Sequence, residues 1–182
     1  NWTYTLGTGL MDPWLVGATA LIPAAGTIAT DLAATLAAAR ATIFAAAPGI
    51  FRQMLRAPLP PLPALRHGLS AGEAMPAQVA ADWLSATGTL VHQALGLSEC
   101  STFISGSPAR PAPSGHVGHP QAGRRIAVLD DAGLPVPTGT PGTLAVDRHD
   151  PGLMLGYSGL PDETARRFAG DWFLTGDQVA EA

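Results

Sequence analysis

The chain has no lysine and only one cysteine among its 182 residues. Its ten positive charges are therefore all arginines, scattered along the sequence, and with a formal net charge of −4 they form no basic patch of the kind that binds nucleic acid. The single Cys100 excludes an internal disulfide framework and is typical of a reducing compartment, so we expect a cytoplasmic protein. The most apolar windows, 14–25 and 32–47, are interrupted by proline or charge and are too short for a membrane span.

What the chain does contain is apolar, because 47% of its residues are hydrophobic and only 13% are charged. It can bury a sizeable core, as one domain or as two small ones. Between residues 18 and 97, short apolar runs alternate with helical patterns, which predicts βαβ units in a parallel α/β layer. The predicted strands are 18–22, 41–44, 64–70 and 89–95, and the predicted helices are 30–40, 48–55 and 76–87.

The pattern changes at about residue 107, where proline and glycine become dense. The elements predicted beyond it are strands at 124–130 and 142–148, a helix at 162–168 and a strand at 171–177 that ends in a Gly-Asp turn. We therefore predict an α/β subdomain over residues 1–110, followed by a small β-rich subdomain with the character of a distorted barrel over residues 111–182.

Two polar loops follow predicted strands, at Ser70–Glu73 and Gly96–Glu99. In open α/β sheets, ligands bind outside the carboxyl ends of the strands. A serine hydroxyl can contact a phosphate, and the Glu99 carboxylate can hold Mg²⁺, which proteins usually bind through one or two carboxylates plus substrate phosphates. Gly72 has no side chain to obstruct a flat base, and Asp177 offers two acceptor oxygens to the hydroxyls of a ribose. Together these features predict an ATP site.

Five ordered motifs resemble those of the adenylate-forming (AMP-binding) superfamily, which contains acyl-CoA and aryl-CoA synthetases, luciferases and peptide-synthetase adenylation domains. The motifs are GLSAGEAMP, QALGLSECSTFI, GHVGHP, LMLGYSGLPDETARRF and GDWFLTGD. The early segment WTYTLGTGLMDPWLVGATALI also resembles the benzoate-CoA ligase branch. The resemblance implies that the chain is part of the large N-terminal domain of an ATP-dependent ligase. Such an enzyme activates a small or aromatic carboxylic acid as an acyl-AMP and transfers it to coenzyme A.

The resemblance also implies roles for individual residues. Glu99 would be the Mg²⁺ ligand and Ser98 the contact to the α-phosphate, so that these two are the candidate catalytic residues, while Asp177 would hold the ribose. The remaining nucleotide contacts would be Ala71, Gly72, Glu73, Gln93, Ala94 and Leu95. The pocket for the acid would be lined by Thr3, Tyr4, Thr5, Leu95, Gly96 and Thr102.

Departures from the benzoate branch bear on the substrate. Thr3, Thr5 and Thr102 change the shape and polarity of the implied pocket, so we expect a small or medium acid with a polar substituent rather than benzoate or a long fatty acid. The phosphate loop of the family and its C-terminal domain with the catalytic lysine are not found in the sequence. We therefore expect these missing segments to act as partners within the same protein, and the fragment alone to be inactive.

Simpler interpretations remain open at this point. Glu99 could be a solvated loop carboxylate, Asp177 could close a tight turn, and Ser70 with Glu73 could be the Ser-x-x-Glu signal of a helix start. Tyr4 could be a core aromatic residue rather than a pocket wall. The alternatives for the whole protein are an adenylation domain that loads a carrier protein, and a non-catalytic homologue that binds a nucleotide.

Overall fold

The structure is a computed structural model that describes residues 7–113 and 115–182. The chain divides into two compact units. Unit 1 comprises the residues up to Gly96 together with Ile104–His119, and unit 2 comprises Leu97–Phe103 together with Pro120–Ala182. Unit 2 is therefore built from two stretches of chain that are separated in sequence, and each unit is described below by itself.

The first sheet has five strands in the order β1-β2-β3-β4-β5, of which β1 and β2 lie wholly in unit 1, whereas β3, β4 and β5 each include residues assigned to unit 2. The strands are β1 (Ile43–Ala45), β2 (His67–Ser70), β3 (Val91–Leu97), β4 (Ser101–Ser105) and β5 (His119–Pro120). β1 pairs with β2, and β2 with β3, in parallel, which confirms the predicted parallel layer. Because Ser70 lies opposite Gln93, the loop that follows β2 starts beside the second half of β3.

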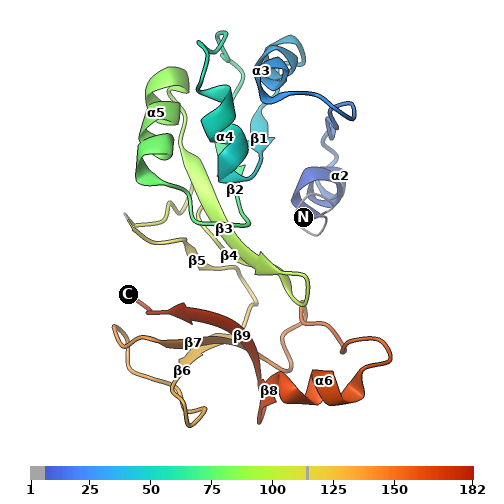
Figure 1. Ribbon diagram of the computed structural model, residues 1–182, viewed down its shortest axis with the longest axis vertical. Coiled ribbons are helices and arrows are strands. Elements are labelled where there is room, and N and C mark those ends of the chain that lie inside the picture. The colour runs from blue at the N-terminus through green and yellow to red at the C-terminus, as the bar shows by residue number, and fades with distance from the viewer. Residues whose placement is uncertain (1–6, 114) are drawn as a thin grey trace. The chain divides into compact units, whose positions relative to one another are not determined.

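The described residues of unit 1 form the short helical elements η1 (Gly7–Met11), α2 (Asp12–Leu15), α3 (Ala29–Ala38), α4 (Pro48–Met54) and α5 (Ala77–Thr87). Figure 1 shows α3, α4 and α5 gathered around β1 and β2. The core between them is aromatic: Phe44, Phe51 and Trp83 pack with ring centroids 4.8–5.9 Å apart. The buried indole N–H of Trp83 donates a hydrogen bond to the hydroxyl of Thr89 at 3.2 Å.

Proline and glycine set the ends of the helices that were predicted well. Pro48 occupies the first turn of α4, where its missing N–H costs nothing. Gly88 ends α5 in the left-handed conformation, with φ of 71°, and its N–H donates to the Leu84 carbonyl at 2.8 Å. The Ser-x-x-Glu interpretation of residues 70–73 is wrong, because α5 begins at Ala77 with Pro76 at its N-cap.

Two predictions near the start of unit 1 are also wrong. Residues 18–22 form neither helix nor strand, and Leu21 and Ile22 are 51% and 71% exposed, so their apolar character does not reflect burial within this chain. α3 begins after Ile28 with no side-chain cap, which places Thr30 and Asp31 inside its first turn rather than at its cap. Asp31 still favours the helix there, since a negative charge complements the dipole at the N-terminus.

Unit 2 contains an antiparallel four-stranded sheet in the order β6-β7-β9-β8, shown with α6 beside β8 in Figure 1. Its elements are β6 (Ile126–Leu129), β7 (Gly142–Asp147), α6 (Pro161–Arg166), β8 (Phe168–Ala169) and β9 (Trp172–Val179). Leu129, Leu144, Val146 and Phe173 are almost fully buried, and the register places Leu144, Val146 and Phe173 on one face of the sheet. The predicted β-rich character of this part of the chain is confirmed.

The predicted Gly-Asp turn at the end of the last strand is wrong. β9 continues through Gly176 and Asp177 to Val179, and its pairing with β7 shifts register between Thr143 and Ala145. This shift is a β-bulge on β9, and Gly176 accommodates it with a φ of 88°, a conformation that glycine adopts without strain.

Candidate functional site

In unit 1, the loop after β2 combines a buried hydroxyl with an open backbone. Ser70 is 1% exposed, and its Oγ has no hydrogen-bond partner among the residues that the structure describes. Ala71 is buried, whereas Gly72 and Glu73 are exposed, and Gly72 has a φ of 98°. Gly72 itself has no side chain to obstruct a flat ligand that approaches its backbone.

The side chain of Gln93 holds this loop against β3. Its Oε1 accepts a hydrogen bond from the backbone N–H of Met75 at 2.8 Å. The structure thus places the predicted nucleotide-contact segment 71–73, which follows the carboxyl end of β2, beside the predicted segment 93–95 in β3. Gln93, predicted as a direct contact, already uses its carbonyl oxygen within the protein, while Ala94 and Leu95 are half-buried.

In unit 2, the candidate metal ligand lies in a tight turn between β3 and β4. Ser98 is exposed, Glu99 is half-buried and Cys100 is fully buried, so the three residues of this turn differ sharply in their access to solvent. Glu99 Oε1 accepts a hydrogen bond from the Tyr157 hydroxyl at 2.7 Å, and the Glu99 carbonyl accepts one from the N–H of Met154 at 2.6 Å. The Glu99 carboxylate is therefore anchored through one oxygen rather than freely solvated.

A buried ion pair between Asp150 and Arg124 holds the backbone of the same turn. Asp150 is 4% exposed, and its carboxylate accepts hydrogen bonds from the N–H groups of Arg125 and Gly152, both at 2.8 Å. It also pairs with Arg124 at 3.4 Å, and Arg124 donates a hydrogen bond to the carbonyl of Cys100. A side chain at Gly152 would displace the Arg124 guanidinium from its present position.

Burial makes Cys100 unreactive. It raises the pKa of the Cys100 thiol to about 11, which outweighs the opposite effects of the backbone hydrogen bond with Leu97 and of the positive charge of Arg124. Only a thiolate is a nucleophile, so this cysteine is a packing residue.

The hydrogen bond to Glu99 raises the pKa of Tyr157, because loss of the phenolic proton would place two anions side by side.

Asp177, the predicted ribose ligand, lies at the β-bulge of β9. Its backbone N–H is satisfied by the hydroxyl of Thr175 at 3.1 Å, and that hydroxyl in turn donates to the Leu144 carbonyl at 2.9 Å. Its Oδ2 is buried and, within the described parts of the chain, has no hydrogen-bond partner. A buried acceptor oxygen without a donor is costly unless a ligand or water supplies the donor, as a ribose hydroxyl would.

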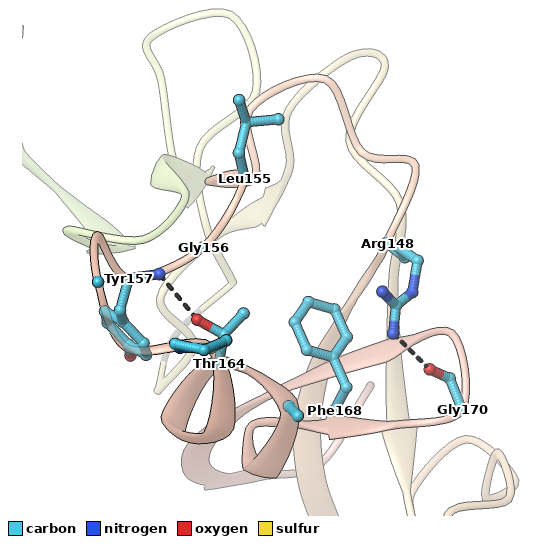
Figure 2. A pocket seen from close by; sticks show the side chains of 10 residues that line it. Arg148, Leu155, Gly156, Tyr157, Thr164, Phe168 and Gly170 are labelled. Carbon is cyan, nitrogen blue, oxygen red and sulfur yellow. Dashed lines mark hydrogen bonds between the residues drawn. The ribbon is translucent and has the colours of Figure 1, made fainter.

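A hollow of about 570 Å³ lies beside Tyr157 in unit 2. Figure 2 shows Tyr157 and Thr164 on one side of it and Arg148 and Phe168 on the other. The guanidinium of Arg148 lies 4.1 Å from the centroid of the Phe168 ring and donates to the Gly170 carbonyl at 3.0 Å. None of the site residues predicted from the sequence lines this hollow.

The predicted pocket for the acid is only partly described. Thr3, Tyr4 and Thr5 lie outside the described residues. Thr102 is half-buried in β4, and Gly96 is exposed in β3. The described residues therefore leave the lining of this pocket a prediction.

Glu99 fits a Mg²⁺ ion whose other ligands are phosphate oxygens better than it fits a metal ion held entirely by protein side chains. Across residues 7–113 and 115–182, no group of three or more His, Cys, Asp or Glu side chains could hold a metal ion. Mg²⁺ needs only one or two carboxylates when phosphates complete its coordination, and Glu99 has a second oxygen beyond the one that Tyr157 contacts.

None of the helices described is long and apolar enough to cross a bilayer.

The sequence singled out Ser98, Glu99 and Asp177 but not Tyr157, Arg124 or Asp150. Tyr157 lies 58 residues from Glu99 in the sequence, and no local sequence pattern predicts their contact. The Asp-Pro-Gly sequence at 150–152 was a visible turn signal, but it does not reveal that the aspartate would be buried against an arginine.

Comparison with known proteins gives consistent matches. Residues 1–158 match the family described as AMP-binding enzyme. A 3-hydroxybenzoate–CoA ligase of Aromatoleum sp. (strain CIB) is 29% identical over 97% of this chain and 34% of that protein. A long-chain-fatty-acid–CoA ligase of Escherichia coli O6:H1 is 38% identical over 60% of this chain and 20% of that protein.

A solved structure agrees with the fold. The crystal structure of an anthranilate CoA ligase in complex with anthranoyl-AMP has a TM-score of 0.87 and 31% identity, covering 97% of this chain and 35% of that chain. The agreement confirms the predicted fold class, an α/β layer with a small β-rich part. The chain spans about a third of the length of this ligase and of the 3-hydroxybenzoate–CoA ligase.

Proposed function

This chain belongs to the AMP-binding enzyme family, and from that membership we propose that it is a segment of an AMP-forming ligase that joins a carboxylic acid to coenzyme A. The observation that carries the proposal is the Glu99 carboxylate, which is held through one oxygen while its other oxygen has no hydrogen-bond partner among the described residues. A solvated loop carboxylate would need no such anchor. The partial coverage of the relatives makes the complete reaction a property of a longer protein, which would also supply the phosphate loop and the lysine.

The proposed reaction has two steps. In the first, an oxygen of the acid attacks the α-phosphorus of ATP, the bond to the β,γ-phosphates breaks, and acyl-AMP and pyrophosphate form. In the second, the thiol of coenzyme A attacks the acyl carbon and loses its proton, and AMP leaves with the bonding electron pair. For attack at phosphorus of this kind, an enzyme acts mainly by positioning the reactants and by neutralising the negative charge of the phosphates.

The predicted nucleotide contacts would each have a separate task. Ala71, Gly72, Glu73, Ala94 and Leu95 would line the adenine, together with Gln93. Ser98 would contact the α-phosphate, Glu99 would hold Mg²⁺, and Asp177 would accept hydrogen bonds from the ribose. Bound Mg²⁺ would neutralise charge on the phosphates. We keep the cytoplasmic location as part of this proposal.

For the substrate, we propose a small or medium carboxylic acid, aromatic or short-chain, with a polar substituent. Two relatives support this class, because one acts on 3-hydroxybenzoate and another was crystallised with anthranoyl-AMP. Thr3, Tyr4, Thr5, Leu95, Gly96 and Thr102 would line the pocket. A carrier protein in place of coenzyme A is the second candidate acceptor, and a carrier domain next to this segment in the longer protein would favour it.

The central test is Glu99→Gln in the full-length protein. We expect it to lose most acid-dependent ATP–pyrophosphate exchange, because the amide keeps the size of the side chain but not the charge that holds Mg²⁺. The melting temperature should stay within a few degrees of wild type, since a polar change in a half-buried turn costs little stability.

Asp131→Asn is the matched control, because it removes a carboxylate from an exposed turn remote in sequence from the motifs. It should leave exchange unchanged. Exchange retained by Glu99→Gln would show that this carboxylate is not the metal ligand, and loss of exchange in both variants would point to a general charge effect.

A further inference from the structure

The segment Asp150–Tyr157, between β7 and α6, makes repeated contact with the turn that carries Glu99. We call residues 150–157 the bracing segment. It overlaps the motif LMLGYSGLPDETARRF, which carried part of the family resemblance but received no role in the proposed site. All of its contacts discussed here lie within unit 2.

The first contact acts on the carboxylate itself. The Tyr157 hydroxyl donates to Glu99 Oε1 at 2.7 Å. A donor fixed to one oxygen restricts rotation of the carboxylate and so determines the direction in which the other oxygen points. Groups that hydrogen-bond to a metal ligand in this way commonly tune its affinity for the metal.

The next contacts act on the backbone of the turn. The Glu99 carbonyl accepts from the N–H of Met154, and the neighbouring Cys100 carbonyl accepts from Arg124. Arg124 is paired with Asp150, the first residue of the bracing segment, whose carboxylate is itself fixed by two backbone N–H groups. Two successive carbonyls of the turn are thus held by groups that depend on the same eight residues.

The bracing segment is in turn fixed to α6. The backbone N–H of Tyr157 donates to the hydroxyl of Thr164 at 2.9 Å, as Figure 2 shows, and that hydroxyl donates to the Leu160 carbonyl at 3.0 Å. Gly156 has a φ of 149°, and a side chain there would press against Thr164. Tyr157 therefore reaches Glu99 from a backbone that is held independently of Glu99.

We propose that Tyr157 is a positioning residue for the Glu99 carboxylate, and that the bracing segment holds the turn in the geometry needed to bind the metal–ATP complex. The inference rests on the proposed function, because it assigns Tyr157 a task in the site where Glu99 is the metal ligand. A tyrosine that merely stabilised the fold would change the melting temperature and leave metal binding alone.

The test is Tyr157→Phe in the full-length protein, which removes the hydroxyl and keeps the ring. The affinity for Mn²⁺·ATP, measured without acid by the enhancement of water proton relaxation, should fall by roughly tenfold to a hundredfold, as for other groups that orient a metal ligand. The melting temperature should stay within a few degrees. Leu155→Ala is the control from the same segment, because Leu155 is fully exposed, and its affinity should equal that of wild type.

The double variant Glu99→Gln, Tyr157→Phe separates the outcomes. If Tyr157 acts through Glu99, the double variant should bind Mn²⁺·ATP no more weakly than Glu99→Gln alone. Full affinity in Tyr157→Phe, combined with loss in Glu99→Gln, would overturn the positioning role and leave the proposed function intact. Full affinity in Glu99→Gln would overturn the metal assignment itself, and additive losses would show that Tyr157 acts independently of Glu99.

Discussion

Asp177 lies in a different structural setting from the one that the sequence predicted. Its carboxylate was expected in a tight turn, yet it lies within β9 at a β-bulge. Bulges redirect side chains, and here the bulge leaves Oδ2 buried without a donor among the described residues. The setting strengthens the case for a ligand, because a residue that only closed a turn would use its oxygens within the turn.

We expect Asp177→Asn to weaken ATP binding by roughly tenfold to a hundredfold, because hydrogen bonds to a charged acceptor are stronger than those to a neutral amide. Affinity for the free acid should be nearly unchanged. Titration calorimetry of the full-length protein with each ligand separately measures both. Equal losses for ATP and acid would indicate a disturbed bulge rather than a lost ribose contact, and Thr175→Ser, which keeps the local hydroxyl, is the control for the fold.

Residues of the candidate site differed in how far the sequence could reveal them. Glu99 and Asp177 belong to short motifs whose polar residues interrupt apolar runs, so the local pattern was sufficient to select them as candidates. Tyr157 and Asp150 gain their meaning from partners 58 and 26 residues away, Glu99 and Arg124, and such contacts depend on how the strands pair. Gln93 was predicted to contact the nucleotide, but its side-chain oxygen accepts a hydrogen bond from the loop after β2.

Among the elements, those with a stereochemical signal were predicted best. α4 and α5 follow from Pro48 and Gly88, whose backbone preferences act locally. The strand expected at 18–22 rested only on apolar composition, which cannot tell a buried strand from an apolar segment that this chain leaves exposed. The bulge in β9 depends on pairing with β7, which no local pattern states.

The neighbouring strands β2 and β3 carry a pair of histidines, His67 and His92, whose rings lie 5.6 Å apart. Burial lowers the pKa of both, and for His67 the proximity of His92 and of Arg66 lowers it further. Both rings therefore stay neutral in the folded chain at a pH where they would begin to charge in the unfolded chain, whose histidine pKa is about 6.5.

The stability of the folded state should consequently fall on acidification. Above about pH 6.5 neither state binds these protons, and the full free energy of unfolding is present. As the pH falls from there toward the lowered pKa values, the unfolded chain takes up more protons and unfolding becomes easier. We expect His67→Gln to lose less stability than wild type between pH 7.5 and 5.5, measured by urea unfolding.

His149→Gln is the comparison, because His149 is exposed, lies outside β2 and β3, and pairs with Asp147 rather than with another histidine. It should follow the pH dependence of wild type much more closely than His67→Gln does. A His67→Gln variant that loses as much stability as wild type would show that the pair on β2 and β3 does not drive the acid response.

For the whole molecule, the two units differ in kind, a parallel α/β unit and an antiparallel β unit. The sequence anticipated this change of character, because helical patterns give way to dense proline and glycine. It did not anticipate that residues 97–103 group with the later part of the chain. The predicted boundary near residue 110 stays a prediction for the longer protein.

The substrate class is a property of the complete enzyme, and a panel of acids tests it. We expect hydroxy- or amino-substituted aromatic acids to release pyrophosphate faster than long-chain fatty acids, because buried hydroxyls left unpaired reject a wrong ligand more strongly than an apolar slot does. Thr102→Val and Thr3→Ala should shift the ranking toward unsubstituted acids. A preference for long-chain acids, or a ranking that neither variant alters, would contradict the pocket assignment.

The discontinuity of unit 2 also bears on the order in which the protein folds during synthesis. The turn with Glu99 leaves the ribosome long before Met154 and Tyr157, and closing the intervening loop of chain carries an entropic cost before any contact repays it. Nascent chains that end before residue 150 therefore contain the candidate metal ligand without Met154 and Tyr157, the two residues that hold it. The capacity to bind the metal–ATP complex would arise only after residue 157 has been synthesised.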